Sequence, residues 1–393
     1  MTTDLSSLQL DLSDLEEIRR AMAERIREGL SSGDGEIAAL PTFLPPPRVE
    51  ESGRALVIDI GGTNIRAAVV ETAAGGEVRL DGEPRIRPLG RDWDSAREFF
   101  DCQADLALSL NPPAGLPLGY CFSYPSRALP DGDAVHLQWN KELRVPGVIG
   151  NRVGKLLREA LERKGYSVPR VRVLNDTVAA LLGGDLLFRR RMELETFIGL
   201  IVGTGTNLAA YFPAARLGER IPPESRGMGP MAVNLESGNF HPPRLSPFDD
   251  RLDAGREDAG QQRLEKAVSG RFLPQLFSYI FSGRTGPPYP DTREIFERAG
   301  APEAEGSETA RLIVNRSADL VAAALAGLID TLETETKIGI LGEGGVINKN
   351  PEYRDRIQKR LAELLEDDPG RPDRFQLLHR ENVNLFGAAA AVG

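Results

Sequence analysis

The chain contains the same short pattern twice, once in each half. An apolar segment, a glycine turn with Thr and Asn, and a second apolar segment occur as LVIDI-GGTN-IRAAVV at residues 56–70 and as FIGLIV-GTGTN-LAAYF at residues 197–212. Apolar runs of this length around glycines are typical of two strands joined by a tight turn. The repetition indicates an internal duplication, so we expect two similar halves whose turns face one another across a cleft.

Segments with strand and helix patterns alternate through the rest of the chain, which indicates an α/β fold. Because 393 residues exceed one ordinary hydrophobic core, we expect two domains. The predicted strands lie at 117–125, 171–175 and 337–347, and the predicted helices lie at 153–165, 177–184, 307–332 and 351–367. Gly183-Gly184 are expected to stop the second of these helices. Residues 381–392 are expected to close the chain as a strand, a turn and a helix.

An amphipathic helix is predicted near the N-terminus. Ser13-Asp14-Leu15-Glu16 has the form of a capping box, and apolar residues then recur at helical spacing until Gly29–Gly33. The polar face mixes acids and bases, which favours packing on a core over binding to a membrane surface. A connector rich in Pro and Gly follows.

Charge and cysteine content exclude several classes of protein. The net charge of -10 argues against a nucleic-acid partner, which requires a basic face. Cys102 and Cys121 form no disulfide framework, and together with the three histidines they lack zinc-ligand spacing, so we expect buried free thiols in a reducing compartment. The N-terminus lacks the pattern of a signal peptide and no apolar run reaches about 20 residues, so we expect a cytoplasmic protein without a membrane partner.

The two glycine turns are candidates for a phosphate site. Gly61, Gly62, Gly203 and Gly205 allow the backbone to approach a phosphate, and Thr63 and Thr204 add hydroxyl donors. Each turn taken alone is more simply explained as a plain hairpin without a ligand. Their paired occurrence, and the carboxylate of Asp59 before the first turn, favour phosphate and a Mg²⁺ ion held directly or through water. The sequence contains neither a P-loop nor a GxGxxG fingerprint.

A second group of polar residues has the chemistry of a sugar site, since amide and carboxylate groups pair well with hydroxyls. Asp176 follows a predicted strand, where it serves either as a helix N-cap or as a functional acid. Glu236 and Glu265, taken singly, are compatible with surface acids. The group comprises Ser123, Asn140, Lys141, Asn175, Asp176, Asn207, Glu236 and Glu265.

These segments resemble the hexokinase family of the sugar kinase, actin and Hsp70 superfamily, from about Leu15 to the C-terminus. The resemblance rests on eight ordered motifs, among them LVIDIGGTNIRAAVV, LGYCFSYPSR with QWNKELRVPGVIG, VLNDTVAALLGG, IGLIVGTGTNLAAYF, MAVNLESGNF and GQQRLEKAVSGRFLPQL. It implies two actin-like, ribonuclease H-like domains around a cleft, with an N-terminal helix. The implied small domain is 54–175 plus 379–393, and the implied large domain is 1–53 plus 176–378.

The resemblance also implies an activity, namely a bacterial-type, ATP-dependent hexokinase or glucokinase. Such an enzyme transfers the γ-phosphoryl group of Mg-ATP to O6 of glucose or a related hexose, and its two domains close on the sugar. Asp176 then matches the general base, and Ser123, Asn140, Lys141, Asn175, Asn207, Glu236 and Glu265 match sugar-binding positions. The first phosphate turn is matched by Asp59, Gly61, Gly62, Thr63, Asn64 and Arg66, the second by Gly203, Thr204 and Gly205, and the nucleoside turn by Gly342, Gly344 and Gly345.

Three positions depart from the family pattern. Asn140 stands where Thr is usual, Glu343 stands where Asp is common, and the segment 381–392 lacks the usual turn with Gly and Lys. Two alternatives to a glucose kinase therefore stay open. One is a sugar sensor without catalysis, and the other is a kinase for another hexose or another phosphoryl donor, such as polyphosphate. The sequence leaves the oligomeric state undetermined.

Overall fold

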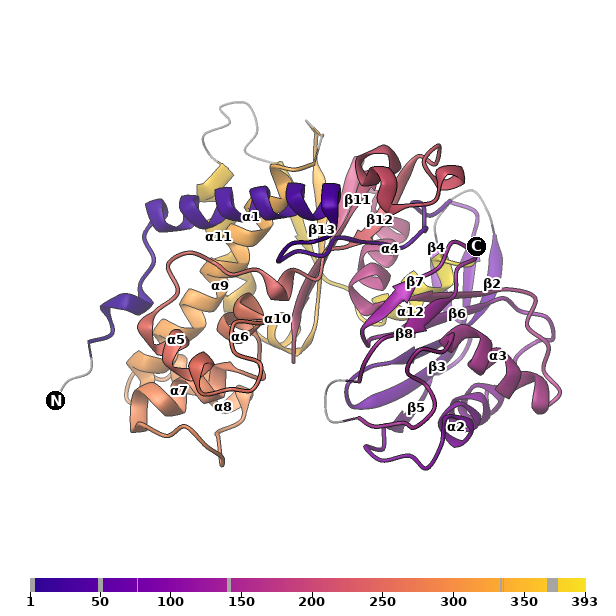
Figure 1. The fold of residues 1–393 in the computed structure, drawn as a ribbon, viewed down its shortest axis with the longest axis horizontal. Helices are drawn as coiled ribbons and strands as arrows, with labels where there is room; N and C mark the ends of the chain where they lie inside the picture. Colours follow the sequence, from indigo (N-terminus) through magenta and orange to yellow (C-terminus); the bar gives the residue numbers. More distant parts are fainter. Residues whose placement is uncertain are drawn as a thin grey trace.

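The computed structural model describes residues 4–48, 52–75, 77–139, 143–332, 334, 336–365 and 374–393. The described chain forms two lobes, each built on its own β-sheet (Figure 1). The N-terminal helix α1 lies on the lobe opposite the one that contains α2 and α3.

The first sheet has the strand order β4-β3-β2-β6-β9, with β5 also paired to β3. Strands β2 and β3 form the hairpin predicted around GGTN, and β6 and β9 continue the sheet in parallel. Helices α2 and α3 pack together beside this sheet. The elements are β2 (Gly53–Ile60), β3 (Asn64–Ala73), β4 (Glu77–Leu80), β5 (Arg85–Pro88), α2 (Ala96–Leu108), β6 (Leu118–Phe122), β7 (Ser126–Ala128), β8 (Ala134–His136), α3 (Val153–Arg163) and β9 (Val171–Leu174).

The second sheet repeats this arrangement, with the order β1-β12-β11-β10-β13-β14. Strands β10 and β11 form the second predicted hairpin, β12 is antiparallel to β11, and β13 and β14 are parallel to β10. The strands are β1 (Leu40–Pro41), β10 (Thr196–Val202), β11 (Thr206–Pro213), β12 (Pro230–Asn234), β13 (Ile338–Glu343) and β14 (Phe375–Leu378). The duplication and the expected α/β fold with two actin-like lobes are therefore confirmed.

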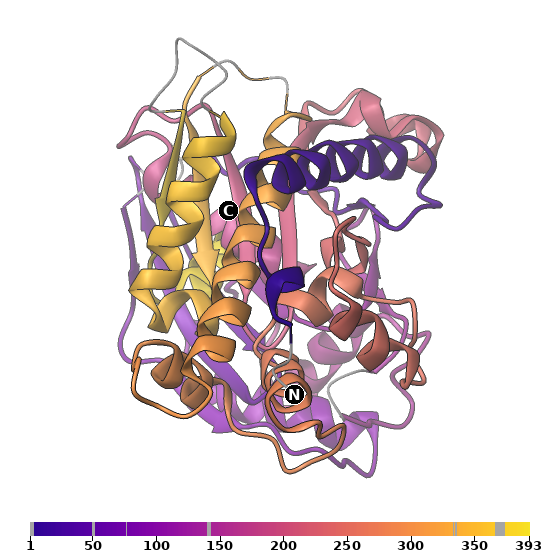
Figure 2. The ribbon, with the colours of Figure 1, turned by 90° about the vertical axis from the view of Figure 1, so that its left-hand side faces the viewer.

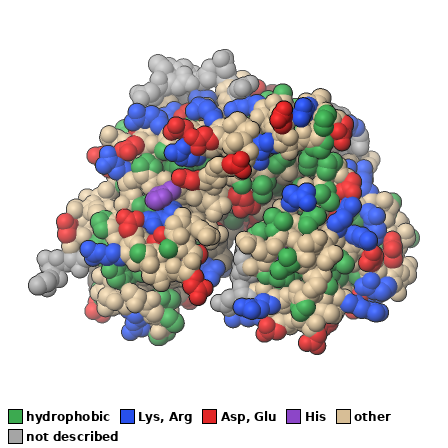
Figure 3. All heavy atoms as spheres, viewed as in Figure 1, with side chains coloured by type: hydrophobic (Ala, Val, Ile, Leu, Met, Phe, Trp, Pro, Cys, Tyr) green, Lys and Arg blue, Asp and Glu red, His purple; other side chains and the backbone are tan. Residues whose placement is uncertain are grey.

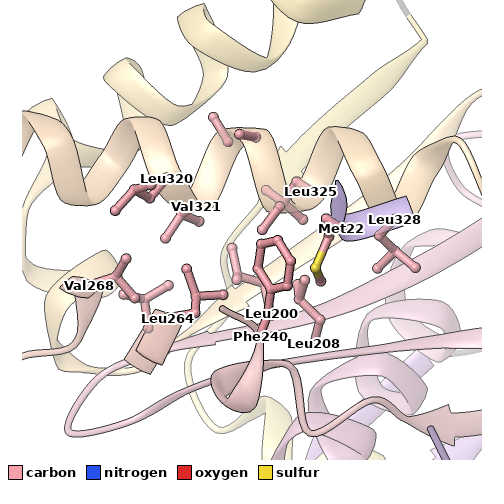
Figure 4. Packing of buried hydrophobic residues seen from close by; sticks show 14 of the residues in the cluster. Met22, Leu200, Leu208, Phe240, Leu264, Val268, Leu320, Val321, Leu325 and Leu328 are labelled. Atoms are coloured by element: carbon pink, nitrogen blue, oxygen red, sulfur yellow. The ribbon is translucent and has the colours of Figure 1, made fainter. Parts of the chain in front are cut away.

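Three long helices cover the outer face of the second sheet (Figure 2). Helix α9 (Ser307–Ile329) packs against both α1 (Leu12–Ser32) and α11 (Pro351–Leu365). Figure 4 shows leucine and valine side chains of α9 pointing toward residues of the sheet and of the loops beneath it. The predicted capping box of α1 is wrong in register, because Asp11 and Asp14 form the box and the helix begins at Leu12. Aspartate accepts the N3 amide as well as serine does, and here the cap lies two residues before the predicted one.

Helix α9 is also long and apolar enough to cross a membrane by length and composition. In its most apolar window, however, 94% of the residues are buried inside the protein. Arg316 and Asp319 lie within the same helix and are themselves buried and ion-paired. Helix α9 is therefore the central core helix of its lobe.

Shorter helices complete this lobe. The described elements are the α-helices α5 (Pro247–Ala254), α6 (Arg263–Val268), α7 (Leu273–Ser282), α8 (Thr292–Ala299) and α10 (Gly345–Lys349), and the 3₁₀-helices η1 (Ser6–Leu8), η2 (Ala214–Arg220), η3 (Pro223–Ser225) and η4 (Ser237–Asn239). Helices α5 to α8 gather at the end of the lobe that is farthest from α1.

Helices α4 (Asp176–Phe188) and α12 (Val383–Ala390) lie between the two sheets and contact each other closely. The prediction that Gly183-Gly184 end α4 is wrong, because the helix continues through them to Phe188. A Cβ on Gly183 would lie 2.5 Å from the carbonyl oxygen of Val383, and one on Gly184 would lie 2.9 Å from Leu341. The two glycines therefore permit close helix packing, and tertiary contacts outweigh their low helix propensity.

Candidate active site

Three glycine turns lie at the ends of β2, β10 and β13. The Gly61 amide donates to the Asn64 carbonyl (3.1 Å), and the Gly203 amide donates to the Gly205 carbonyl (2.9 Å). A Cβ on Gly203 would lie 3.2 Å from the Cα of Gly344, so the second and third turns are in direct backbone contact. A Cβ on Gly61 or on Gly345 would meet no atom within 4 Å, which leaves room for a ligand beside both backbones. Gly342 lies inside β13, where its lack of a side chain makes room for Ile347.

Asp59, the acid among apolar residues, occupies the middle of a row that crosses the first sheet. Arg66 and Cys121 are its register partners on β3 and β6, so the three side chains share one face of the sheet. The Arg66 guanidinium donates to Asp59 Oδ2 through Nε (2.8 Å) and through Nη2. This carboxylate raises the pKa of Arg66, and burial raises the pKa of the Cys121 thiol. Both cysteines of the chain are buried and free, as expected.

Glu343 brings a second acid to the same region from the other lobe. Burial raises the pKa of Glu343, while the charges of Arg66 and His379 act in the opposite direction. The charge of Asp59 also raises the pKa of Glu343. The Asn348 side chain donates to Glu343 Oε2 (3.1 Å) and orients it.

The two adjacent residues Asn175 and Asp176 have separate structural roles. Asn175 is the N-cap of α4, and its Oδ1 accepts the amides of Thr177 (2.8 Å) and Val178 (3.2 Å). Asp176 is the first residue of the helix and not its cap, so the interpretation of Asp176 as an N-cap is wrong. Its Oδ1 accepts the Thr177 amide (2.8 Å), and its side chain is only partly buried. The cap therefore does not require the Asp176 carboxylate.

A chain of amide hydrogen bonds orients the acids of the second lobe. Asn207 Nδ2 donates to Asn234 Oδ1 (2.7 Å), and Asn234 Nδ2 donates to Glu236 Oε1 (2.7 Å). Glu236 adopts the left-handed conformation with φ 55°, which is uncommon for a residue with a side chain and is frequent at functional sites. Glu265 Oε2 accepts the Thr206 amide (3.0 Å). Asn234 was not predicted from the sequence, although it lies two residues before Glu236.

The structure brings part of the predicted sugar site together across the lobes. Asn175 from the first lobe and Asn234 and Glu236 from the second line one small cavity of 40 Å³. Ser123 is buried at the end of β6, where its amide donates to the Ile60 carbonyl (3.2 Å). Figure 3 shows the surface deeply indented between the lobes. Asn140 and Lys141 lie outside the described residues.

An aromatic cluster that sequence reasoning missed supports this side of the cleft. The Tyr124 hydroxyl donates to the Gly61 carbonyl (3.0 Å) and thereby links the predicted sugar motif to the first phosphate turn. The Tyr124 ring packs edge-on against Trp139, and Trp139 lies 4.1 Å from the His136 ring by centroid distance. Burial lowers the pKa of His136 to about 4, so this histidine is neutral at physiological pH. Tyr124 was visible in FSYPSR, but only its contact reveals its role.

A large cavity of 1120 Å³ adjoins the second and third glycine turns. Its wall includes Gly203, Thr204 and Gly345, together with the apolar side chains of Phe296 and Val346. Its cationic lining comprises Arg271, Arg293, Arg311, Lys349 and Arg356. A cavity with an apolar wall, cations and backbone amides suits a ligand with a flat ring system and phosphates.

The acids of the site fit a magnesium ion that is shared with phosphates. No cluster of three His, Cys, Asp or Glu side chains with metal geometry occurs among the described residues. Mg²⁺ in phosphate sites, however, is usually held by one or two carboxylates plus phosphate oxygens and waters. The buried Asp59 and the partly buried Glu343 supply two carboxylates beside the glycine turns.

Duplicated lobes with glycine turns at the ends of their central strands define an actin-like fold. Residues 2–186 match one hexokinase family model, and residues 197–283 and 306–393 match a second. The chain therefore belongs to the hexokinase family, as its motifs indicated.

Curated relatives agree with this assignment. Human hexokinase-2 is 28% identical over 98% of this chain and 47% of its own length, and mouse hexokinase-3 is 33% identical over 70% of this chain and 30% of its own length. The chain thus spans less than half the length of these relatives. Hexokinase from Schistosoma mansoni, complexed with glucose, has the same fold, with a TM-score of 0.82 and 24% identity over 99% of this chain and 96% of that one. A ROK family glucokinase from Streptomyces griseus in complex with glucose and AMPPNP gives a TM-score of 0.56 at 19% identity over 86% of this chain and 99% of that one.

Proposed function

We propose that this protein is an ATP-dependent hexokinase that phosphorylates O6 of glucose or a related hexose. The observation that carries the proposal is the arrangement of Asp176. It directly follows Asn175, which lines the small cavity together with Asn234 and Glu236, and the fold does not need the Asp176 carboxylate as a helix cap. Family membership and the named relatives support the same activity.

In the proposed mechanism, Asp176 accepts the proton of the attacking sugar hydroxyl. Within the described part of the chain, both hydrogen bonds accepted by Asp176 go to Oδ1, so Oδ2 is the oxygen that we expect to take the proton. Asn207, Glu236 and Glu265 hold other hydroxyls, with Asn234 orienting the first two. Ser123, Asn175, Asn140 and Lys141 complete the proposed sugar contacts from the first lobe.

The donor nucleotide is proposed to occupy the 1120 Å³ cavity, with its phosphates between the turns. The two glycine turns, at Gly61 and Gly62 and at Gly203 and Gly205, with Thr63 and Thr204, are the proposed phosphate contacts. The amides of Gly61 and Gly203 donate within their own turns, so we expect the other amides and the hydroxyls to reach the phosphates. Asn64 and Arg66 flank the first turn, and Gly342, Gly344 and Gly345 form the nucleoside side. A Mg²⁺ ion near Asp59 and Glu343 would neutralise the phosphate charge, which is the main requirement of phosphoryl transfer.

Sugar binding is proposed to close the lobes, because its ligands come from both. The moving units are proposed to be 54–175 with 379–393 and 1–53 with 176–378. Closure would exclude water, which otherwise competes with the sugar as nucleophile. The expected location is the cytoplasm, where ATP and hexoses are available.

A coupled assay of glucose, fructose and mannose with ATP and with polyphosphate tests the activity. We expect ATP and glucose to give the highest kcat/KM. Sugar binding without transfer from any donor would instead identify a sensor, and a preference for another sugar or donor would redefine the substrate.

A further inference from the structure

Glu265 is presented by an unusually short helix. Helix α6 contains only residues 263–268. Its N-cap residue, Gln262, adopts the left-handed conformation and makes no side-chain cap hydrogen bond. A helix of this length is unstable by itself, because nucleation costs more than a single turn returns. Contacts with the rest of the lobe must therefore fix the position of Glu265.

One face of α6 is anchored in the hydrophobic core. Leu264 and Val268 are buried, and Figure 4 shows them lying under Leu320 and Val321 of α9. Hydrophobic contacts of this kind resist separation of the helices but are non-directional. They hold α6 down without fixing its rotation.

A second face is held by ion pairs. Arg263 also pairs with Asp250 and Lys266 also pairs with Asp258, but Asp253 on helix α5 contacts both cations. Asp253 Oδ2 accepts from Arg263 Nη1 (2.6 Å), and Asp253 Oδ1 accepts from Lys266 Nζ (2.6 Å). These cations lie on either side of Glu265 in the sequence, so Asp253 contacts α6 both before and after that residue. Asp253 is only 5% exposed and also accepts the Gly260 amide (2.7 Å). Burial alone would raise its pKa, but the hydrogen bonds from Lys266, Gly260 and Arg263 lower it to about 2.

The Glu265 side chain itself is also held closely, at the second glycine turn. Glu265 accepts the Thr206 amide, and a Cβ on Gly205 would lie 2.6 Å from Glu265 Oε2. The carboxylate of Glu265 thus contacts the second glycine turn directly. A small rotation of α6 would move the Glu265 carboxylate, a proposed sugar ligand, away from the Thr206 amide.

Helix α5 is itself anchored at its other end. Asp249 Oδ1 accepts from Arg316 Nη2 of α9 (2.7 Å), and both residues are buried. Asp253 therefore projects from a fixed base. Buried ion pairs often add little net stability compared with apolar packing, which suggests that this one serves geometry.

We propose that Asp253, through Arg263 and Lys266, is a positioning residue that sets Glu265 for sugar binding. This inference rests on the proposed function, and it assigns no contact between Asp253 and the sugar. It makes two measurable statements. When the contacts of Asp253 with Arg263 and Lys266 are removed, the Thr206 amide should lose protection from hydrogen exchange. Glucose affinity should fall, while the KM for ATP is retained.

The test uses the full chain with Asp253→Asn and the milder Lys266→Met, which leaves the Arg263–Asp253 pair in place. Lys266→Arg is the conservative variant expected to restore function. Asp319→Asn is the matched control, because Asp319 is a buried acid with two arginine partners on the side of α9 that faces α11. Hydrogen exchange of residues 203–210 is measured without ligand, and the glucose Kd is measured by calorimetry without nucleotide.

We expect faster exchange around Thr206 and a glucose Kd raised by about tenfold to 100-fold in Asp253→Asn, with a smaller change in Lys266→Met. The ATP KM should change less than about twofold, within the scatter expected for uncoupled sites. Lys266→Arg should lie near wild type, and Asp319→Asn should lose thermal stability without either effect.

Unchanged exchange around Thr206 in a folded Lys266→Met and Asp253→Asn would overturn the proposal. Faster hydrogen exchange together with wild-type glucose affinity would also overturn it, because the contacts of Asp253 with Arg263 and Lys266 would then have a structural role only. If the wild-type protein binds no glucose, the proposed function fails, and the exchange data still decide whether Asp253 positions Glu265.

Discussion

Replacing Asn175 and Asp176 one at a time, at the start of α4, should separate an effect on stability from an effect on catalysis. Asn175 caps the helix and Asp176 is its first residue, so the two neighbours are expected to fail in opposite ways. Asp176→Asn keeps the shape of the side chain and removes the proton acceptor. Asn175→Ala removes the acceptor of the Thr177 and Val178 amides and leaves the acid in place.

The expected magnitudes follow from these contacts. Loss of a positioned general base costs roughly 10²–10⁴-fold in turnover, or about 3 to 5 kcal/mol of activation free energy. Loss of an N-cap costs about 1 kcal/mol of folding free energy. With about 2.1 cal/mol/K of unfolding entropy per residue, that loss lowers Tm by roughly 1 °C in a chain of 393 residues.

Turnover is measured by a coupled assay at saturating sugar and ATP, and Tm by scanning calorimetry. We expect Asp176→Asn to lose at least 100-fold in kcat, by the same general-base estimate, with Tm unchanged and the glucose Kd within about tenfold. A folded Asp176→Asn variant that keeps a tenth or more of wild-type turnover would refute its role as base.

Three further outcomes are expected. Gly205→Val should raise the KM for both ATP and glucose in steady-state assays, because its side chain would displace the Glu265 carboxylate; unchanged kinetics in a folded variant would remove Gly205 from the site. Saturating glucose should reduce the radius of gyration in small-angle scattering more than ATP alone does, and an identical radius would count against closure. Burial raises the pKa of Asp185 to about 6, so the native protein loses stability as the pH rises from 3.8 through about 6. Asp185→Asn should therefore stabilise the protein by up to about 3 kcal/mol near pH 8 and by little below pH 4 in denaturant unfolding, and an equal gain at both pH values would contradict this cause.

The sequence was sufficient for the fold because its strongest signals are local. Apolar runs around glycine turns determined both hairpins, and their repetition predicted the duplicated sheets. Helix α4 was predicted too short because two consecutive glycines usually end a helix. Their structural role depends on contacts with Val383 and Leu341, which are distant in the sequence. Local propensity cannot contain such tertiary contacts.

The candidate site was predicted by residue type but not by how its members hold one another. The spacing of these residues in the sequence does not show that Asn234 links Asn207 to Glu236. It also does not show that Asp253 binds a cation on each side of Glu265. These partners lie on other elements and become neighbours only after the lobe has folded. The catalytic, substrate and metal roles assigned to individual residues remain predictions for the experiments described above.

The contact between α4 and α12 has a consequence for how the two lobes can move. A Cβ on Gly387 would lie 1.8 Å from the Ala179 carbonyl, so the two helix backbones touch with almost no side chain between them. Helix α12 also packs on β2 and β6, whereas α4 packs on β10 and β13. Helices that meet through glycine and other small residues can slide past each other, in a shear motion, without repacking large side chains. A bulky residue at Gly387 would push the two helices apart, and it would change how the lobes move while every proposed ligand-binding residue stayed intact.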